Sequence, residues 1–274
     1  IAKLEQLISA EDDEYEGIKD IETGVVTGPS HDLVFVYTGM GPQWWAMGRE
    51  LYQTSTVFQE AMIEADQAFQ HHSGWSVLDE ILKDQEESRI ASNQFAQPAN
   101  FVLQYGLSRL LDTLGLQPSL IVGHSVGELC AALMAGALSL SDAALIAYHR
   151  SRLQQLKAGQ GRMLATGLDI ETAQEIVGLY DGSISVGAIN GDQSIALSGD
   201  HGDLEAICDE LIESDIFAKF IFGEVAYHSH QMDELEDELR DVLKGLKPIS
   251  PTTRLYSTVT GDLIKDAVHN ADYW

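Results

Sequence analysis

A serine lies between two glycines in a pattern suited to nucleophilic chemistry. Residues 123–127 read Gly-His-Ser-Val-Gly, which fits G-x-S-x-G. In this pattern the glycines let a strand turn sharply into a helix, and the strained turn exposes the serine hydroxyl. The pentapeptide arises by chance in roughly one chain in ten of this length, so its context matters more. An apolar run precedes it and a run rich in Ala and Leu follows it, which favours a nucleophile elbow at Ser125 over a structural serine in a tight turn.

A serine hydroxyl is a weak nucleophile and needs a base, for which the chain offers nine histidines. His228 and His230 lie at the predicted end of a strand, and strand ends form the rim of an α/β sheet, where sites are built. The other histidines lie in predicted loops or helices, and His124 is expected to point away from the serine on its sharp turn. The His-x-His pair also suits a metal, but no third ligand has suitable spacing, so we predict no metal site.

These side chains need a scaffold, and the hydrophobic pattern predicts one. The apolar run 33–37 is typical of a buried parallel strand and leads into a tight glycine-containing loop and a helix. A second strand at 120–122 leads into the elbow and into a helix of small residues. Two buried strands, each followed by a helix, predict a parallel, α/β-hydrolase-like sheet. Further elements are predicted as helices at 142–156, capped by Ser141 and Asp142, and at 234–244, and as a strand at 254–260.

The stretch 161–224 has a different rhythm. Its elements follow the order β-α-β-β-α-β, which is the ferredoxin-like order. They are predicted at 163–167, 170–179, 183–190, 194–199, 204–214 and 217–222. We therefore interpret the stretch as a small ferredoxin-like subdomain inserted into the larger α/β body. The chain then divides into an acidic segment at 1–32, a large subdomain at 33–160, the small subdomain at 161–224, and a return to the large subdomain at 225–274.

Composition excludes several classes of protein. The chain has 274 residues with 16 Lys and Arg against 43 Asp and Glu, a net charge of −27, so phosphates of nucleic acids and anionic membranes would be repelled. Hydrophobic residues make up 45%, which suffices for a full core. No apolar run reaches the roughly 20 residues of a membrane span. Two cysteines do not make a disulfide framework, so a reducing, cytoplasmic location is expected.

Six short motifs occur in order along the chain. They are Gly39-Met40-Gly41-Pro42-Gln43-Trp44, Gln97-Pro98-Ala99, Gly123-His124-Ser125-Val126-Gly127-Glu128, Arg150-Ser151, Ala188-Ile189-Asn190-Gly191 and Ala226-Tyr227-His228-Ser229. On these motifs residues 33–274 resemble the acyltransferase domains of modular polyketide synthases and animal fatty acid synthases. The chain is more distantly similar to stand-alone malonyl-CoA:acyl-carrier-protein transacylases. The resemblance implies that 1–32 is the end of a ketosynthase-to-acyltransferase linker and that the family's domain continues past residue 274.

The resemblance assigns the reacting groups. Ser125 would be the acylated nucleophile and His228 its base, because the family places the catalytic histidine before Ser-x-x-Met. His230 falls on a variable position and ranks second. The family uses a Ser-His dyad, although the sequence itself leaves an Asp partner open. The oxyanion hole would use the backbone N–H groups of Met40 and Val126.

The resemblance also assigns substrate contacts. Arg150 would bind the free carboxylate of a malonyl group through two parallel hydrogen bonds, with Arg152 as its competitor. Gln43 and Gln97 match polar positions that line the family's site, although capping or loop hydrogen bonds explain them equally well.

Two positions bear on the choice between malonyl and methylmalonyl. Malonyl-selective members tend to carry a branched or apolar residue after the nucleophile, as Val126 is. The aromatic Tyr227 before His228 resembles the malonyl pattern, because a bulky ring leaves little room for an α-methyl group. Val225 departs from that pattern. One methyl group is worth only about 1–3 kcal/mol in an apolar pocket, so selectivity could be incomplete.

The resemblance thus implies a ping-pong acyltransferase. It would move a malonyl unit from malonyl-CoA, through a serine ester, to the phosphopantetheine thiol of an acyl carrier protein in polyketide or fatty acid synthesis. The partners would be acyl-CoA, the carrier protein and an adjacent ketosynthase domain, and neither a metal nor a redox cofactor is required. A serine hydrolase of the thioesterase or lipase type shares the elbow and the Ser…His order. An idle docking module for carrier proteins is the third alternative.

Overall fold

The computed structural model describes residues 32–41 and 43–274. The predicted linker at 1–32 lies outside the described residues except for Asp32, and so does Pro42 of the first motif. In the described part, no helix is long and apolar enough to cross a membrane. The elements form two separate sheets, each with its own hydrophobic core.

The first sheet carries the predicted elbow. Its strand order is β1-β2-β7-β8, and its members are β1 (Val34–Tyr37), β2 (Leu120–Gly123), β7 (Arg254–Tyr256) and β8 (Leu263–Ile264). The first three strands are parallel, as predicted, and β8 adds a short antiparallel strand that the sequence did not indicate. Because β1 and β2 pair with Tyr37 opposite Gly123, their carboxyl ends lie side by side.

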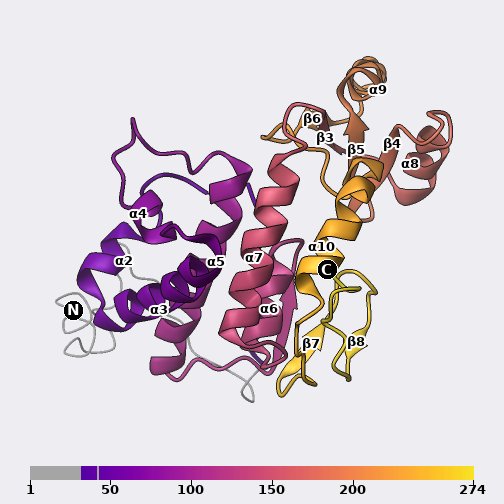
Figure 1. Cartoon of the computed structure of the whole chain (residues 1–274). Coiled ribbons are helices and arrows are strands. Elements are labelled where there is room, and N and C mark those ends of the chain that lie inside the picture. Colours follow the sequence, from indigo (N-terminus) through magenta and orange to yellow (C-terminus); the bar gives the residue numbers. More distant parts are fainter. Residues whose placement is uncertain (1–31, 42) are drawn as a thin grey trace, which may run out of the picture. The chain divides into compact units, whose positions relative to one another are not determined.

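Helices bury the apolar side chains of this sheet. They are α2 (Arg49–Thr54), α3 (Thr56–Ser73), α4 (Val77–Ile81), α5 (Asn93–Thr113), α6 (Gly127–Met134) and α7 (Leu140–Gln155), and α5, α6 and α7 pack together (Figure 1). Phe58, Phe101, Ile121 and Ile146 are fully buried among them. The predicted cap of α7 was wrong by two residues, because Ser139 accepts a hydrogen bond from the Asp142 N–H and starts the helix at Leu140.

The second sheet confirms the ferredoxin-like prediction. Its elements follow the order β3 (Gly161–Thr166), α8 (Ile170–Val177), β4 (Ile184–Gly191), β5 (Ser194–Asp200), α9 (His201–Glu213) and β6 (Ala218–Phe220). Every pairing is antiparallel and the spatial order is β4-β5-β3-β6, so the first strand lies between the third and the last. These strands are grouped with α8 and α9 (Figure 1). The division of the chain into subdomains at residues 160 and 224 stays a prediction.

The chain after β6 returns to the first sheet. The helix predicted at 234–244 is split into a 3-10 turn, η1 (His230–Leu235), and α10 (Glu236–Leu243). Strand β7 is shorter than the predicted 254–260, because Thr258 leaves the ladder and hydrogen-bonds Glu128 with both its N–H and its hydroxyl. That contact joins the first turn of α6 to the last part of the described chain.

Candidate active site

Ser125 occupies the turn between β2 and α6, as the motif predicts. Its φ is 53°, in the left-handed region that side chains other than glycine rarely adopt. Such strained residues persist where the surrounding structure holds them, and this turn directs the hydroxyl into a cavity. The helix α6 begins two residues later, so the positive end of its dipole lies next to Ser125.

Two glycines allow the backbones around Ser125 to approach each other. A Cβ on Gly127 would lie 2.1 Å from the carbonyl oxygen of Tyr37, which no real Cβ tolerates. A Cβ on Gly39 would lie 3.1 Å from the carbonyl oxygen of His124 and 3.2 Å from its Nδ1. The glycines of both motifs therefore let the loop after β1 contact the elbow after β2.

The elbow glycine supports a stability prediction. Gly127→Ala should lower the free energy of unfolding by about 1–3 kcal/mol, since the added methyl group meets backbone atoms of β1 that cannot move aside alone. The matched control is Gly202→Ala in α9, where a Cβ has nothing within 4 Å and should leave stability unchanged or slightly raised. Urea unfolding of both variants provides the measurement, and equal midpoints would contradict the steric argument.

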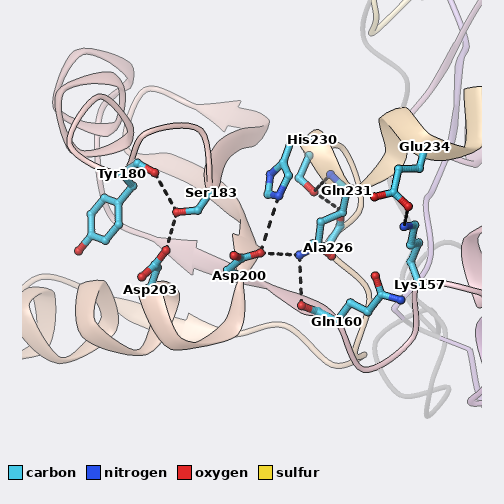
Figure 2. Close-up of polar contacts among 11 residues, drawn as sticks. Lys157, Gln160, Tyr180, Ser183, Asp200, Asp203, Ala226, His230, Gln231 and Glu234 are labelled. Atoms are coloured by element: carbon cyan, nitrogen blue, oxygen red, sulfur yellow. Dashed lines mark hydrogen bonds and ion pairs between the residues drawn. The ribbon is translucent and has the colours of Figure 1, made fainter.

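His228 lies beside Ser125, with its Nε2 atom 2.9 Å from the serine Oγ. Its φ of 59° is also left-handed, so both members of the pair have strained backbone. The competing His230 turns toward the small sheet instead, where its Nε2 lies 3.7 Å from Asp200 Oδ1 (Figure 2). Asp200 also accepts a hydrogen bond of 2.7 Å from Gln231 Nε2. Between the two histidines, the geometry therefore selects His228.

The surroundings of His228 keep its ring neutral at physiological pH. Desolvation, and then the positive charge of Arg150 and the neighbouring His124, lower the pKa of His228 to about 4. A neutral Nε2 can accept a proton from the serine hydroxyl. Within residues 32–41 and 43–274, no Asp or Glu hydrogen-bonds this ring, so the part described contains a Ser-His pair without a third acidic member.

Two backbone N–H groups flank the same cavity. Met40, in the loop after β1, and Val126, directly after the serine, both line it. Among the described residues, neither N–H donates a hydrogen bond to another group, so both remain available as donors. Gln43 also lines the cavity, and its Oε1 accepts a 2.7 Å hydrogen bond from the N–H of Gly41. Gln43 therefore shapes the loop that carries Met40.

Arg150 reaches the cavity from α7 and is the only Lys or Arg among the described residues that line it. Burial lowers its pKa to about 10, which still leaves the guanidinium charged at neutral pH. Its Nη1 donates to the Oε1 atom of Gln97. Arg152 lies elsewhere, 2.7 Å from Glu238 on α10 and in contact with His149. The structure thus separates the two arginines that the sequence left in competition.

Gln97 is fully occupied by protein partners. It is completely buried on α5, and its Nε2 donates to Asn93 Oδ1 at 2.5 Å and to Gln154 Oε1 at 2.6 Å. Its Oε1 already accepts from Arg150. Both amide hydrogens are therefore used, and the geometry makes Gln97 a support for Arg150 more than a direct contact for a ligand.

The cavity has a volume of about 120 Å³ and lies between the elbow and the second sheet. Tyr227 forms part of its wall, and burial raises the pKa of the phenol to about 12. Small or apolar side chains from the second sheet and from the segment after it complete the wall: Met163, Ala188, Ala196, Ile221, Phe222 and Val225. One positively charged side chain, Arg150, and one hydroxyl, that of Ser125, therefore share a small and otherwise largely apolar cavity.

Comparison with known proteins identifies the family. The family model described as "Acyl transferase domain" matches residues 34–274. The chain belongs to this acyl transferase family. It is 36% identical over 256 residues to the highly reducing polyketide synthase ltbA of Aspergillus luteorubrus, covering 90% of this chain and 8% of that protein. It is 35% identical over 253 residues to the erythronolide synthase EryA3 of Saccharopolyspora erythraea, covering 92% of this chain and 8% of that protein.

A solved structure agrees with this assignment. The acyltransferase domain from module 8 of the salinomycin polyketide synthase superposes with a TM-score of 0.85 at 30% identity, covering 89% of this chain and 57% of that one. The chain spans only 8% of the length of each of the two curated relatives named above. These comparisons confirm the resemblance and the fold predicted from the sequence, and they give no support to the hydrolase alternative.

Sequence reasoning missed several residues around the site of this acyltransferase domain. His124 does not point away as expected, because its ring lines the cavity and its Nε2 lies 3.0 Å from Asn190 Oδ1 on β4. Asn93 and Glu128 are buried polar residues next to the site: Asn93 accepts a hydrogen bond from Tyr227, and Glu128 accepts from Thr258 and Tyr273. Asn190 and Glu128 lie inside quoted motifs, which is the signal that could have found them. Asn93 carries no such signal, since only the fold brings it near Tyr227.

Proposed function

We propose that this acyltransferase domain transfers a malonyl unit from malonyl-CoA to the phosphopantetheine thiol of an acyl carrier protein. The observation that carries the proposal is the partly buried Arg150 in the same small cavity as the Ser125–His228 pair. A guanidinium suits a carboxylate, and malonyl offers one at the end opposite to its thioester. A neutral acyl chain would leave this partly buried positive charge without a counter-charge.

In the first half-reaction, Ser125 Oγ attacks the thioester carbonyl while His228 Nε2 takes the hydroxyl proton. The oxyanion accepts hydrogen bonds from the N–H groups of Met40 and Val126. When the tetrahedral intermediate collapses, the C–S bond breaks, coenzyme A leaves as a thiol with the proton from His228, and a malonyl ester remains on Ser125. Arg150 holds the carboxylate throughout.

In the second half-reaction, the phosphopantetheine thiol of the carrier protein attacks the ester. His228 takes the thiol proton and returns it to Ser125 Oγ as the C–O bond breaks. The mechanism needs no metal or redox cofactor. Supporting a carrier partner, the relatives are multidomain polyketide synthases, and we propose an adjacent ketosynthase domain on the same grounds.

Malonyl is the preferred extender in this proposal. Val126 adds a branched side chain directly after the nucleophile, and the ring of Tyr227 narrows the cavity wall. An α-methyl group would need space that the ring occupies. Because one methyl group is worth about 1–3 kcal/mol, kcat/KM for malonyl-CoA should exceed that for methylmalonyl-CoA by some tens of fold, so methylmalonyl should still be loaded slowly.

The destination of the acyl group tests the proposal. The protein would be mixed with equal amounts of malonyl-CoA, methylmalonyl-CoA and acetyl-CoA, and its intact mass and peptide map recorded before and after addition of a phosphopantetheine-bearing carrier protein. We expect a malonyl adduct on Ser125 that moves to the carrier thiol faster than to water. Free malonate in place of a loaded carrier would indicate a hydrolase. Neither an adduct nor released coenzyme A would indicate an idle docking module.

A further inference from the structure

A buried amide lies behind the cavity at the start of α5. Asn93 is 6% exposed, and both its Nδ2 and its Oδ1 have a hydrogen-bond partner. Its Nδ2 donates to the carbonyl oxygen of Ser151 at 2.9 Å, which fixes the orientation of the amide. Its Oδ1 then accepts from the Tyr227 hydroxyl at 3.0 Å and from Gln97 Nε2 at 2.5 Å. The side chain therefore connects α5 and α7 to the segment that carries His228.

Tyr227 is held both at its backbone and at its phenol hydroxyl. At the backbone end, the Tyr227 carbonyl oxygen accepts a 2.5 Å hydrogen bond from Ser198 Oγ on β5. At the other end, the phenol O–H donates to Asn93. A partly buried hydroxyl that loses its acceptor costs free energy, so the hydrogen bond to Asn93 favours this one position of the ring. In that position it lines the cavity together with Ser125 and Arg150.

We propose that Asn93 is a positioning residue that sets the width of the acyl pocket through Tyr227. The proposal rests on the malonyl function above, in which the acyl group spans from Ser125 to Arg150 past this ring. A substituent on the central carbon of the acyl group must displace the ring. The hydrogen bond from Tyr227 to Asn93 resists that displacement, so the pair disfavours branched acyl groups without Asn93 touching the substrate.

The same amide also supports Gln97, which contacts Arg150. Asn93 could therefore act on substrate choice through Tyr227 or through Gln97 and Arg150, and these two possibilities predict different results. If Asn93 acts through Tyr227, its loss changes the preference between malonyl and methylmalonyl. If it acts through Arg150, its loss changes the preference between malonyl and neutral acetyl, because Arg150 reads the carboxylate that both malonyl forms share.

Competition among the three acyl-CoA substrates separates these two possibilities, with adduct masses as the readout. Asn93→Ala should raise the methylmalonyl-to-malonyl loading ratio about tenfold and change the malonyl-to-acetyl ratio by less than twofold. Tyr227→Phe keeps the ring and removes its hydrogen bond to Asn93, and it should raise the methylmalonyl-to-malonyl ratio by a similar factor. In the double variant the two shifts should not multiply, because both substitutions remove the same hydrogen bond between Asn93 and Tyr227. Gln154→Ala removes the other partner of Gln97 Nε2 and should leave the first ratio unchanged.

An unchanged methylmalonyl-to-malonyl ratio in folded Asn93→Ala would overturn the proposal, and so would multiplying shifts in the double variant. If Asn93→Ala does not fold, Tyr227→Phe alone decides, since an unchanged ratio there removes this hydrogen bond from the explanation. If the wild type loads no acyl group, the malonyl function fails and this proposal fails with it. A wild type that loads malonyl while the variants keep its ratios contradicts the Asn93 proposal alone.

Discussion

Ser125→Ala should abolish formation of the acyl-enzyme. The serine Oγ lies 2.9 Å from His228 Nε2 and, on the proposed mechanism, forms the ester bond itself. Removing a catalytic serine from a Ser-His system costs up to about a millionfold in turnover, so a loss of at least roughly a thousandfold is expected here. The mass of the protein after incubation with malonyl-CoA should show no adduct, and release of coenzyme A should fall to the uncatalysed rate.

Two further variants make this result specific. His228→Ala should reduce loading nearly as far, and the double variant should be no worse than Ser125→Ala, because the two side chains act as one unit. Ser194→Ala, at an exposed position of β5, should load normally. Alanine at 125 removes only the Oγ atom, so the unfolding temperature should stay close to that of the wild type. A malonyl adduct on another residue of Ser125→Ala would contradict the assignment of the nucleophile.

Much of the fold followed from local patterns in the sequence. The strands before the two active-site loops are short apolar runs, and the β-α-β-β-α-β order of the second sheet could be read because turns and amphipathic segments alternate there. Element ends were less accurate. Ser139, not Ser141, caps α7, since either serine suits the motif and only packing chooses between them. Strand β7 stops early because Thr258 bonds a carboxylate from a distant helix.

The residues of the site also differ in how far the sequence predicts them. Ser125 could be predicted because its motif follows strand β2, but the expectation that His228 ends a strand was wrong, since β6 stops at Phe220 and His228 lies in the irregular segment after it. The motif around His228 still marked it, and the direction of each side chain then favours His228 over His230. The supporting contacts could not be predicted. Asn93 and Tyr227 are separated by 134 positions, and their hydrogen bond exists only because α5 packs behind the segment after β6. The motifs contain the residues proposed to react and some that support them, such as Gln97, whereas the partners of these residues depend on tertiary packing.

Arg150→Ala should remove the preference for malonyl. Breaking a buried carboxylate–guanidinium contact costs about 3–5 kcal/mol, so kcat/KM for malonyl-CoA should fall more than a hundredfold. The value of kcat/KM for acetyl-CoA should rise, because its binding no longer leaves a positive charge in the cavity without a counter-charge. The matched control is Arg152→Ala, whose guanidinium lies 2.7 Å from Glu238 outside the cavity and should have no part in loading. Unchanged malonyl loading in Arg150→Ala, or loss of loading in Arg152→Ala, would show that a positively charged side chain other than Arg150 binds the carboxylate.

The same substitution should also change the pH dependence of the reaction. His228 works as a base only when neutral, so kcat/KM falls as pH drops through its pKa, which desolvation and Arg150 hold below the usual value near 6.5. Removing the positive charge of Arg150 removes part of that shift, so the pKa of His228 rises and the acid fall in rate moves to higher pH. Acetyl-CoA is the substrate for this measurement, because its acyl group has no carboxylate to titrate or to pair with Arg150. An acid limb at the same pH in both proteins would mean that Arg150 does not influence the base. A malonyl carboxylate bound to Arg150 cancels the same charge, and substrate binding would therefore make His228 a stronger base at the step that needs one.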